Sequence, residues 1–132
     1  MTNEPEPISE EVPLTAKTIL IVEDDADVGD FLVQALVQET AYHPLLASNG
    51  FQALKLARGV RFDLLLLDYQ LPSMDGLELY DHLHLSKEGA NIPVIIMSAN
   101  LPLDKILERD LRWLKKPFSL DDLLQTIEQL LG

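Results

Sequence analysis

Two short apolar runs of this chain end in carboxylates, and these acids are the residues whose type and position could do chemistry. Residues 64–67 are four leucines that lead directly into Asp68, and residues 19–22 lead into Glu23 and Asp24. A continuous apolar run is typical of a strand buried on both faces, and open α/β sheets place their ligand chemistry at the carboxyl ends of strands. Carboxylates gathered there repel one another unless a cation enters, and Mg²⁺ prefers such an all-oxygen site. The sequence therefore predicts one shared acidic pocket that binds Mg²⁺.

Strand and helix signals alternate along the chain and give the elements that must position this pocket. Apolar and β-branched runs predict strands over residues 18–22, 42–47, 62–67, 93–97 and 113–115. Helical spacing predicts a helix capped by Asp27 with Phe31 on its apolar side, helices over 50–59 with Phe51 on its apolar side, 76–85 and 103–110, and a last helix capped by Ser119. The pair His43-Pro44 favours an edge position for the second strand, because proline cannot donate to a ladder. Five strands alternating with five helices indicate a parallel sheet with helices on both faces.

Composition bounds the class of protein. The 132 residues are 47% hydrophobic, which fits one domain with a full core, and the net charge of −12 argues against direct binding of nucleic acid. Residues 1–14 carry four glutamates and no basic residue, so we expect a disordered acidic tail before a folded domain at 15–132. The chain has no cysteine, no signal peptide in residues 1–14 and no apolar run of membrane-spanning length, so we expect a cytoplasmic protein without membrane insertion.

Four segments at the predicted strand ends resemble a known family. Residues 19–25 (ILIVEDD), 66–76 (LLDYQLPSMDG), 93–99 (PVIIMSA) and 114–118 (LKKPF) are similar, in this order, to the receiver domains of two-component response regulators, in particular to stand-alone regulators of the chemotaxis type. The resemblance covers residues 17–131. It implies an α/β, flavodoxin-like, doubly wound fold with a five-stranded parallel sheet in the order 2-1-3-4-5.

The resemblance also implies roles for the acids. Asp68 matches the phospho-acceptor of the family, and Glu23 and Asp24 match the acidic pair that holds Mg²⁺ together with Asp68. The backbone carbonyl of Gln70 matches a further metal ligand. Chemistry supports these roles, because a carboxylate can attack phosphorus to give an acyl phosphate while the protein positions and neutralises the transferring group.

Three further residues match positions that respond to the phosphoryl group. Ser98 matches the hydroxyl that binds it, and Lys116 matches the lysine that pairs with it. Lys115 is a control within the sequence, because only one of two strand neighbours can point into the pocket. Trp113 matches the aromatic switch position, where family members usually carry Tyr, Phe or His.

Each of these residues has a plainer structural interpretation. Asp68 could cap a strand end, Glu23 and Asp24 could complement a helix dipole, and Ser98 could be a turn hydroxyl. Lys116 could be solvated, and Trp113 could be a core aromatic. We expect Asp75 to be a loop or N-cap residue, and His43, His82 and His84 to be surface residues.

The segment from Ser98 to Lys116 departs from the family pattern. It is a few residues shorter than in family members and lacks their small-residue turn before the fifth strand. We therefore expect the fourth helix to be short or partly unwound.

The resulting hypothesis is a signalling switch rather than a metabolic enzyme. A histidine kinase or histidine phosphotransfer protein would pass a phosphoryl group to Asp68, and output would pass through contacts with a downstream protein. One alternative is a receiver-like interaction module that works without phosphorylation. Another is an aspartyl-phosphate hydrolase of the haloacid-dehalogenase type, which is disfavoured because Gln70 stands where that family carries a second aspartate.

Overall fold

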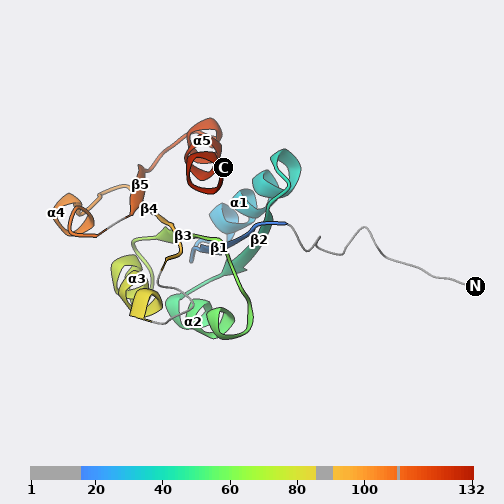
Figure 1. Cartoon of the computed structure of the whole chain (residues 1–132). Coiled ribbons are helices and arrows are strands. Elements are labelled where there is room, and N and C mark those ends of the chain that lie inside the picture. Colours follow the sequence, from blue (N-terminus) through green and yellow to red (C-terminus); the bar gives the residue numbers. More distant parts are fainter. Residues whose placement is uncertain (1–15, 86–90, 110) are drawn as a thin grey trace, which may run out of the picture.

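The computed structural model describes residues 16–85, 91–109 and 111–132, and within them a parallel sheet carries helices on both faces (Figure 1). The elements in chain order are β1 (Thr18–Val22), α1 (Ala26–Glu39), β2 (His43–Ala47), α2 (Gly50–Gly59), β3 (Leu64–Asp68), α3 (Gly76–Leu85), β4 (Val94–Ser98), α4 (Leu103–Ile106), β5 (Arg112–Lys115) and α5 (Leu120–Leu131). The predicted acidic tail, residues 1–14, lies outside the described residues. No described helix is long and apolar enough to cross a membrane.

The sheet has five strands in the order β2-β1-β3-β4-β5, all parallel, which confirms the predicted fold. β2 is an edge strand, as the His43-Pro44 pair indicated. In the β1–β3 ladder Val22 pairs with Leu67. The residues that follow, Glu23 and Asp68, therefore lie side by side at the carboxyl ends of these strands.

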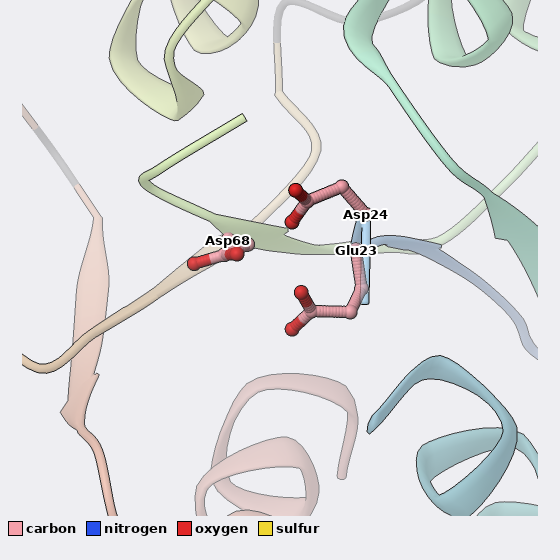
Figure 2. A group of neighbouring side chains, drawn as sticks. All are labelled: Glu23, Asp24 and Asp68. Atoms are coloured by element: carbon pink, nitrogen blue, oxygen red, sulfur yellow. The ribbon is translucent and has the colours of Figure 1, made fainter. Parts of the chain in front are cut away.

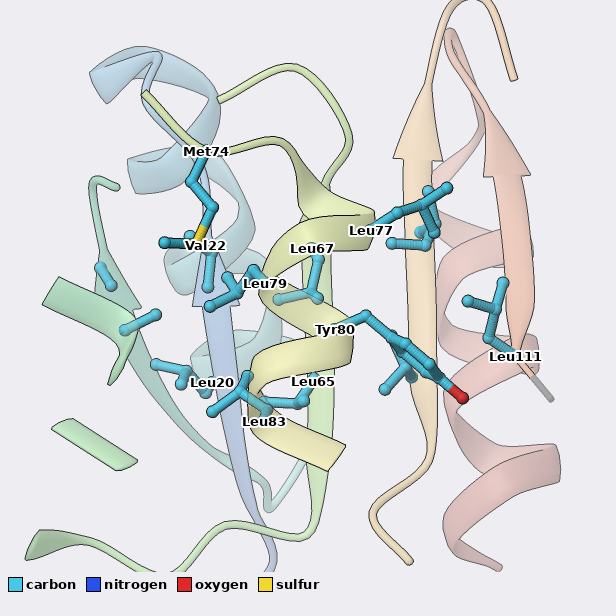
Figure 3. Close-up of a cluster of buried hydrophobic side chains, with 14 of the residues drawn as sticks. Leu20, Val22, Leu65, Leu67, Met74, Leu77, Leu79, Tyr80, Leu83 and Leu111 are labelled. Carbon is cyan, nitrogen blue, oxygen red and sulfur yellow. The ribbon is translucent and has the colours of Figure 1, made fainter. Parts of the chain in front are cut away.

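Two apolar layers hold the helices on the sheet. Strand side chains alternate between the faces, so Leu20, Leu65 and Ile96 join one buried cluster and Ile21, Leu66 and Ile95 join the other. The first cluster packs against α2 and α3. Figure 3 shows Leu79 and Leu83 of α3 lying over β1 and β3. The second packs against α1 and α5. Every residue of β3 and β4 is buried, so the strand that ends in Asp68 is held from both faces.

The fourth helix is short, as expected, and ends at Ile106 instead of residue 110. Its N-cap, Pro102, offers no side-chain acceptor for the first turn. Of the helix residues Ile106 alone is buried, while Leu103 and the following Leu107 are exposed. The helix is short because packing of an apolar stripe supplies most helix stability in proteins, and α4 has only one buried side chain, Ile106.

Three predictions about α1 and α2 need correction. The N-cap of α1 is Asp25, not Asp27, because its carboxylate accepts hydrogen bonds from the backbone N–H groups of Asp27 and Val28. Phe31 and Phe51 were expected on buried helix faces but are 58% and 61% exposed. Each lies beside a residue of the buried stripe, and one position along a helix turns a side chain by about 100°.

Candidate functional site

Three consecutive acids after β1 have three different environments. The N–H of Glu23 donates to the carbonyl of Ala47 at 3.0 Å, which extends the β1–β2 ladder by one residue and turns the Glu23 side chain inward, where it is 2% exposed. Asp24 is exposed at the same edge. Asp25 turns away to cap α1, and its N–H donates to Oε2 of Glu23 at 3.2 Å. Glu23 and Asp24 are thus available to the pocket, whereas Asp25 serves the helix.

Asp68 is the last residue of β3 and is 6% exposed. The loop after it folds back sharply, because the N–H of Gly76 donates to the carbonyl of Tyr69 at 2.8 Å. A Cβ at position 76 would lie only 2.6 Å from the carbonyl oxygen of Asp68, so glycine is required at this close approach. Asp75 starts α3 with a reciprocal cap, in which its carboxylate accepts from the N–H of Glu78 and its own N–H donates to the Glu78 carboxylate. The expected N-cap role of Asp75 is confirmed.

Lys116, the residue after β5, brings a cation to the acids. Its N–H donates to the carbonyl of Ser98 at 2.8 Å, and its peptide bond to Pro117 is cis. Its Nζ lies 3.0 Å from Oε1 of Glu23 and 3.5 Å from Oδ1 of Asp68. Lys115 is exposed, so the structure separates the two lysines as the sequence control anticipated.

The carboxylates of Glu23, Asp24 and Asp68 converge on one space beyond the ends of β1 and β3 (Figure 2). One oxygen from each lies within 4.8 Å of the others. Three carboxylates face one ammonium group, so negative charge is in excess. Two buried acids and one exposed acid, all oxygen donors, suit Mg²⁺, which is held by a few carboxylates and keeps several waters.

The pKa values of Glu23 and Lys116 reflect this excess of negative charge. Burial, helped by the neighbouring Asp68 carboxylate and opposed by the hydrogen bond from Lys116, raises the pKa of Glu23 to about 7. Burial alone would lower the pKa of Lys116, but its hydrogen bond to Glu23 and the charge of Asp68 outweigh burial, so the pKa is raised. Lys116 therefore stays cationic, while the metal-free site holds more negative charge than it can easily stabilise.

The remaining predicted site residues surround this centre. Ser98 is buried at the end of β4, next to the Met97 position that pairs with Asp68, and its hydroxyl lies within hydrogen-bond distance of the backbone of Asn100. Gln70 is exposed in the loop after β3. Trp113 is 41% exposed on β5, which makes the core-aromatic interpretation wrong.

Two other contacts were not found by sequence reasoning. His84 is half-buried rather than on the surface: its ring stacks on Tyr80 at 4.0 Å between centroids, and its nitrogens approach the carbonyls of Tyr80 and Ile92. Arg109 makes a two-point contact with Asp81, with Nε at 3.0 Å and Nη2 at 2.8 Å from the two carboxylate oxygens. The second pair is 28 residues apart in the sequence, and no local pattern connects its members.

Comparison with known proteins is consistent with this geometry. The family model for the response regulator receiver domain matches residues 19–128. The response regulator receiver protein CpdR of Brucella abortus is 38% identical over 117 residues, covering 87% of this chain and 97% of its own length. Sporulation initiation phosphotransferase F of Bacillus subtilis is 36% identical, covering 86% and 92%. The receiver domain of the sensor histidine kinase PA1611 of Pseudomonas aeruginosa, solved with a magnesium ion coordinated in its active-site cleft, superposes with a TM-score of 0.77 at 29% identity, covering 89% and 99%.

Proposed function

The chain belongs to the response regulator receiver family, and from this membership we propose that it accepts a phosphoryl group on Asp68 and signals through protein contacts. Receiver domains act as signalling switches, and their homologues interact with histidine kinases or phosphotransfer proteins. The observation that carries the proposal is the approach of Lys116 Nζ to the Glu23 and Asp68 carboxylates, within a group of three acids that could hold a metal.

The proposed transfer needs little from the protein beyond a nucleophile and charge. A carboxylate oxygen of Asp68 attacks the phosphorus of a phosphohistidine, the new O–P bond forms as the P–N bond breaks, and the departing imidazole takes up a proton. Lys116 supplies a point charge to the phosphoryl oxygens, and the Ser98 hydroxyl donates a hydrogen bond to them.

Mg²⁺ fits the acidic donor set described above. Asp24, Glu23, Asp68 and the backbone carbonyl of Gln70 would hold it, directly or through water. When bound, it supplies the positive charge that the negative phosphoryl group requires as it enters an acidic pocket. Reversal of the switch is hydrolysis, in which water attacks phosphorus and the O–P bond breaks to restore the Asp68 carboxylate.

Labelling with a small phosphodonor tests the nucleophile. With Mg²⁺ present, the wild-type chain should take up one phosphoryl group, and Asp68→Asn should take up none. Asp30→Asn, which removes an exposed acid from α1, is the matched control and should label normally. Stoichiometric labelling of the Asp68 variant would refute the assignment.

The metal role is tested separately by Asp24→Asn. Removing one of three converging carboxylates relieves repulsion, so the metal-free variant should be more stable than wild type while binding Mg²⁺ more weakly. Thermal unfolding with and without Mg²⁺ measures both effects, because a bound ion raises the melting temperature by mass action. Equal Mg²⁺ affinity in variant and wild type would exclude Asp24 as a ligand.

A second candidate function is a receiver-like module that works without phosphorylation. The observation in its favour is the four-residue α4, which leaves little helix to reorient on phosphorylation. Beryllofluoride with Mg²⁺ mimics the phosphorylated aspartate and separates the candidates. A change in the fluorescence of Trp113 supports a working switch, and an unchanged spectrum together with unchanged amide spectra supports the alternative.

A further inference from the structure

A cavity of about 610 Å³ lies at the opposite end of β3 from Asp68. It opens between the last turn of α2, the segment that leads into β3 and the start of β4. Val60, Phe62, Ile92 and Pro93 form apolar walls, and Arg58 and Arg61 line the same space. The cavity thus combines an apolar floor with two guanidinium groups, a combination suited to a carboxylate-bearing segment.

The charge around this cavity is opposite to that of the rest of the molecule. Residues 40–62 contain no Asp or Glu, although the chain has 22 of them, and include Lys55, Arg58 and Arg61. In the described part of the chain, the ion pairs involve Arg109 and Lys116, and neither Arg58 nor Arg61 takes part in one. Neither arginine has a carboxylate partner among the described residues, although the chain has a net charge of −12, and together they offer a site for an anion.

Two ordinary explanations account for only part of this arrangement. Arg58 lies in the last turn of α2, where a cation complements the helix dipole. Arg61 lies beyond the helix and gains nothing from it. Asp63 also lines the cavity, but its carboxylate oxygen Oδ2 accepts a hydrogen bond from the N–H of Thr18 at 2.8 Å. That acid joins β1 to β3, and its single negative charge cannot neutralise both arginines.

The same hydrogen bond places Thr18, which follows the chain's acidic segment in the sequence, beside a residue that lines the cavity. Thr18 is the first residue of β1, and its carbonyl accepts from the N–H of Asp63 at 2.8 Å. The preceding segment, residues 4–11, carries four glutamates and no basic residue. Glu11 is seven residues before Thr18, which gives a reach of about 23 Å at ~3.3 Å per residue, while Arg61 is two residues from Asp63.

We propose that residues 4–11 bind in this cavity as an intramolecular anionic ligand, with their glutamates paired to Arg58 and Arg61. Tethering raises the effective concentration of the segment to about the millimolar range, so weak contacts suffice. The apolar side chains of the segment, such as Ile8, match the apolar walls. This inference does not depend on the proposed function, because the cavity and Asp68 lie at opposite ends of β3.

A spin label on the segment tests the proposal directly. The chain has no cysteine, so Ser9→Cys in the full chain gives one attachment site for a nitroxide. At low salt the amides of residues 58–62 and 91–92 should lose intensity relative to the reduced label. The loss should disappear in the Arg58→Gln/Arg61→Gln variant and persist in Lys115→Gln, an exposed lysine at the other edge of the sheet. Broadening that is absent, or unchanged without the two arginines, would overturn the proposal.

Further measurements separate the other possible occupants. A variant with all four glutamates of residues 4–11 changed to Gln leaves the folded part intact and should also abolish the broadening. Mixing labelled chain with unlabelled, isotope-enriched chain should give no broadening; if it does, the segment binds a second copy and the intramolecular proposal fails. Inorganic phosphate should shift the same amides more strongly in the four-Gln variant than in wild type. Equal shifts in both would show a free anion site that the segment does not occupy.

Discussion

Each residue of β3 and β4 is buried, whereas three of the four residues of β5 are exposed. The acidic site is positioned by buried strands. Helices cover β1, β3 and β4 on both faces, and the ends of these strands hold Glu23, Asp68 and Ser98. The α4–β5 side is held by two buried side chains, Ile106 and Leu111, and by the partly exposed contact between Arg109 and Asp81. The acidic site is thus tightly packed, and the α4–β5 segment beside it is held by few buried contacts. This difference is expected of a switch in which the site stays fixed while a neighbouring segment moves.

Truncation of Ile106, the buried residue of α4, should change the free energy of unfolding more than any other substitution considered below. Ile106→Ala removes a fully buried side chain and should lower the free energy of unfolding by about 2–5 kcal/mol. Leu107→Ala, the next residue, is the matched control: it is 71% exposed and should change stability by less than about 0.5 kcal/mol. Urea unfolding measures both. If the two variants were equally stable, α4 would not be anchored through Ile106.

A substitution at Gly76, in the turn that packs against Asp68, should destabilise the tightly packed part of the protein. Gly76→Ala places a methyl group against the backbone of Asp68 and should cost about 2–3 kcal/mol, together with slower phosphoryl uptake. Gly59→Ala is the control, because no atom lies within 4 Å of the added Cβ; it should be neutral or slightly stabilising, since alanine favours helices. A Gly76→Ala variant with wild-type stability would show that the loop after Asp68 can shift to accommodate the methyl group.

The metal-free site should make stability fall with pH. The pKa of Glu23 is about 7 in the folded protein, above its ordinary value of 4.5, so the folded state binds the additional proton between these values. This contribution to stability is full below about pH 4.5 and is lost as pH rises through about 7, an effect on the order of 3 kcal/mol. Lys116, whose pKa is also raised, does not titrate in this range.

Urea unfolding in a chelator at pH values from 5 to 8 checks this dependence. Glu23→Gln should flatten the decline, and the exposed control Glu39→Gln should keep it. Saturating Mg²⁺ should also flatten it in wild type, because the cation favours the ionised carboxylates. An identical slope for Glu23→Gln and wild type would assign the decline to another group.

The Arg109–Asp81 contact should have the smallest effect. Both side chains are at least partly exposed, so a double-mutant cycle with alanine at both positions should give a coupling of about 0.5–1 kcal/mol. The hydrogen bond from Arg109 lowers the pKa of Asp81, so the coupling should persist at neutral pH and be lost as acid protonates Asp81. Hydrogen exchange adds a local measurement: Arg109→Ala should speed exchange of the Leu107 and Leu111 amides and leave β3 unchanged. Uniform acceleration would indicate a global effect.

Much of the fold and of the site was predictable from the sequence, because the relevant signals are local. Apolar runs that end in acids gave the central strands, and parallel pairing places their carboxyl ends at one edge. Glu23, Asp24, Asp68 and Lys116 therefore meet as expected, and Lys116 rather than Lys115 faces the acids. The shortened segment after Ser98 also predicted the short α4.

Tertiary structure decided what local pattern could not. Phe31 and Phe51 satisfy helical spacing but face away from the sheet, because rotation about the helix axis is fixed by which neighbours pack. The Arg109–Asp81 pair and the cavity with Arg58 and Arg61 join residues from separate elements, and no spacing rule relates them. The sequence by itself determined which elements form and which chemistry ends each strand. Only the packed structure determined which side chains meet across elements, because those contacts depend on distances that chain order does not encode.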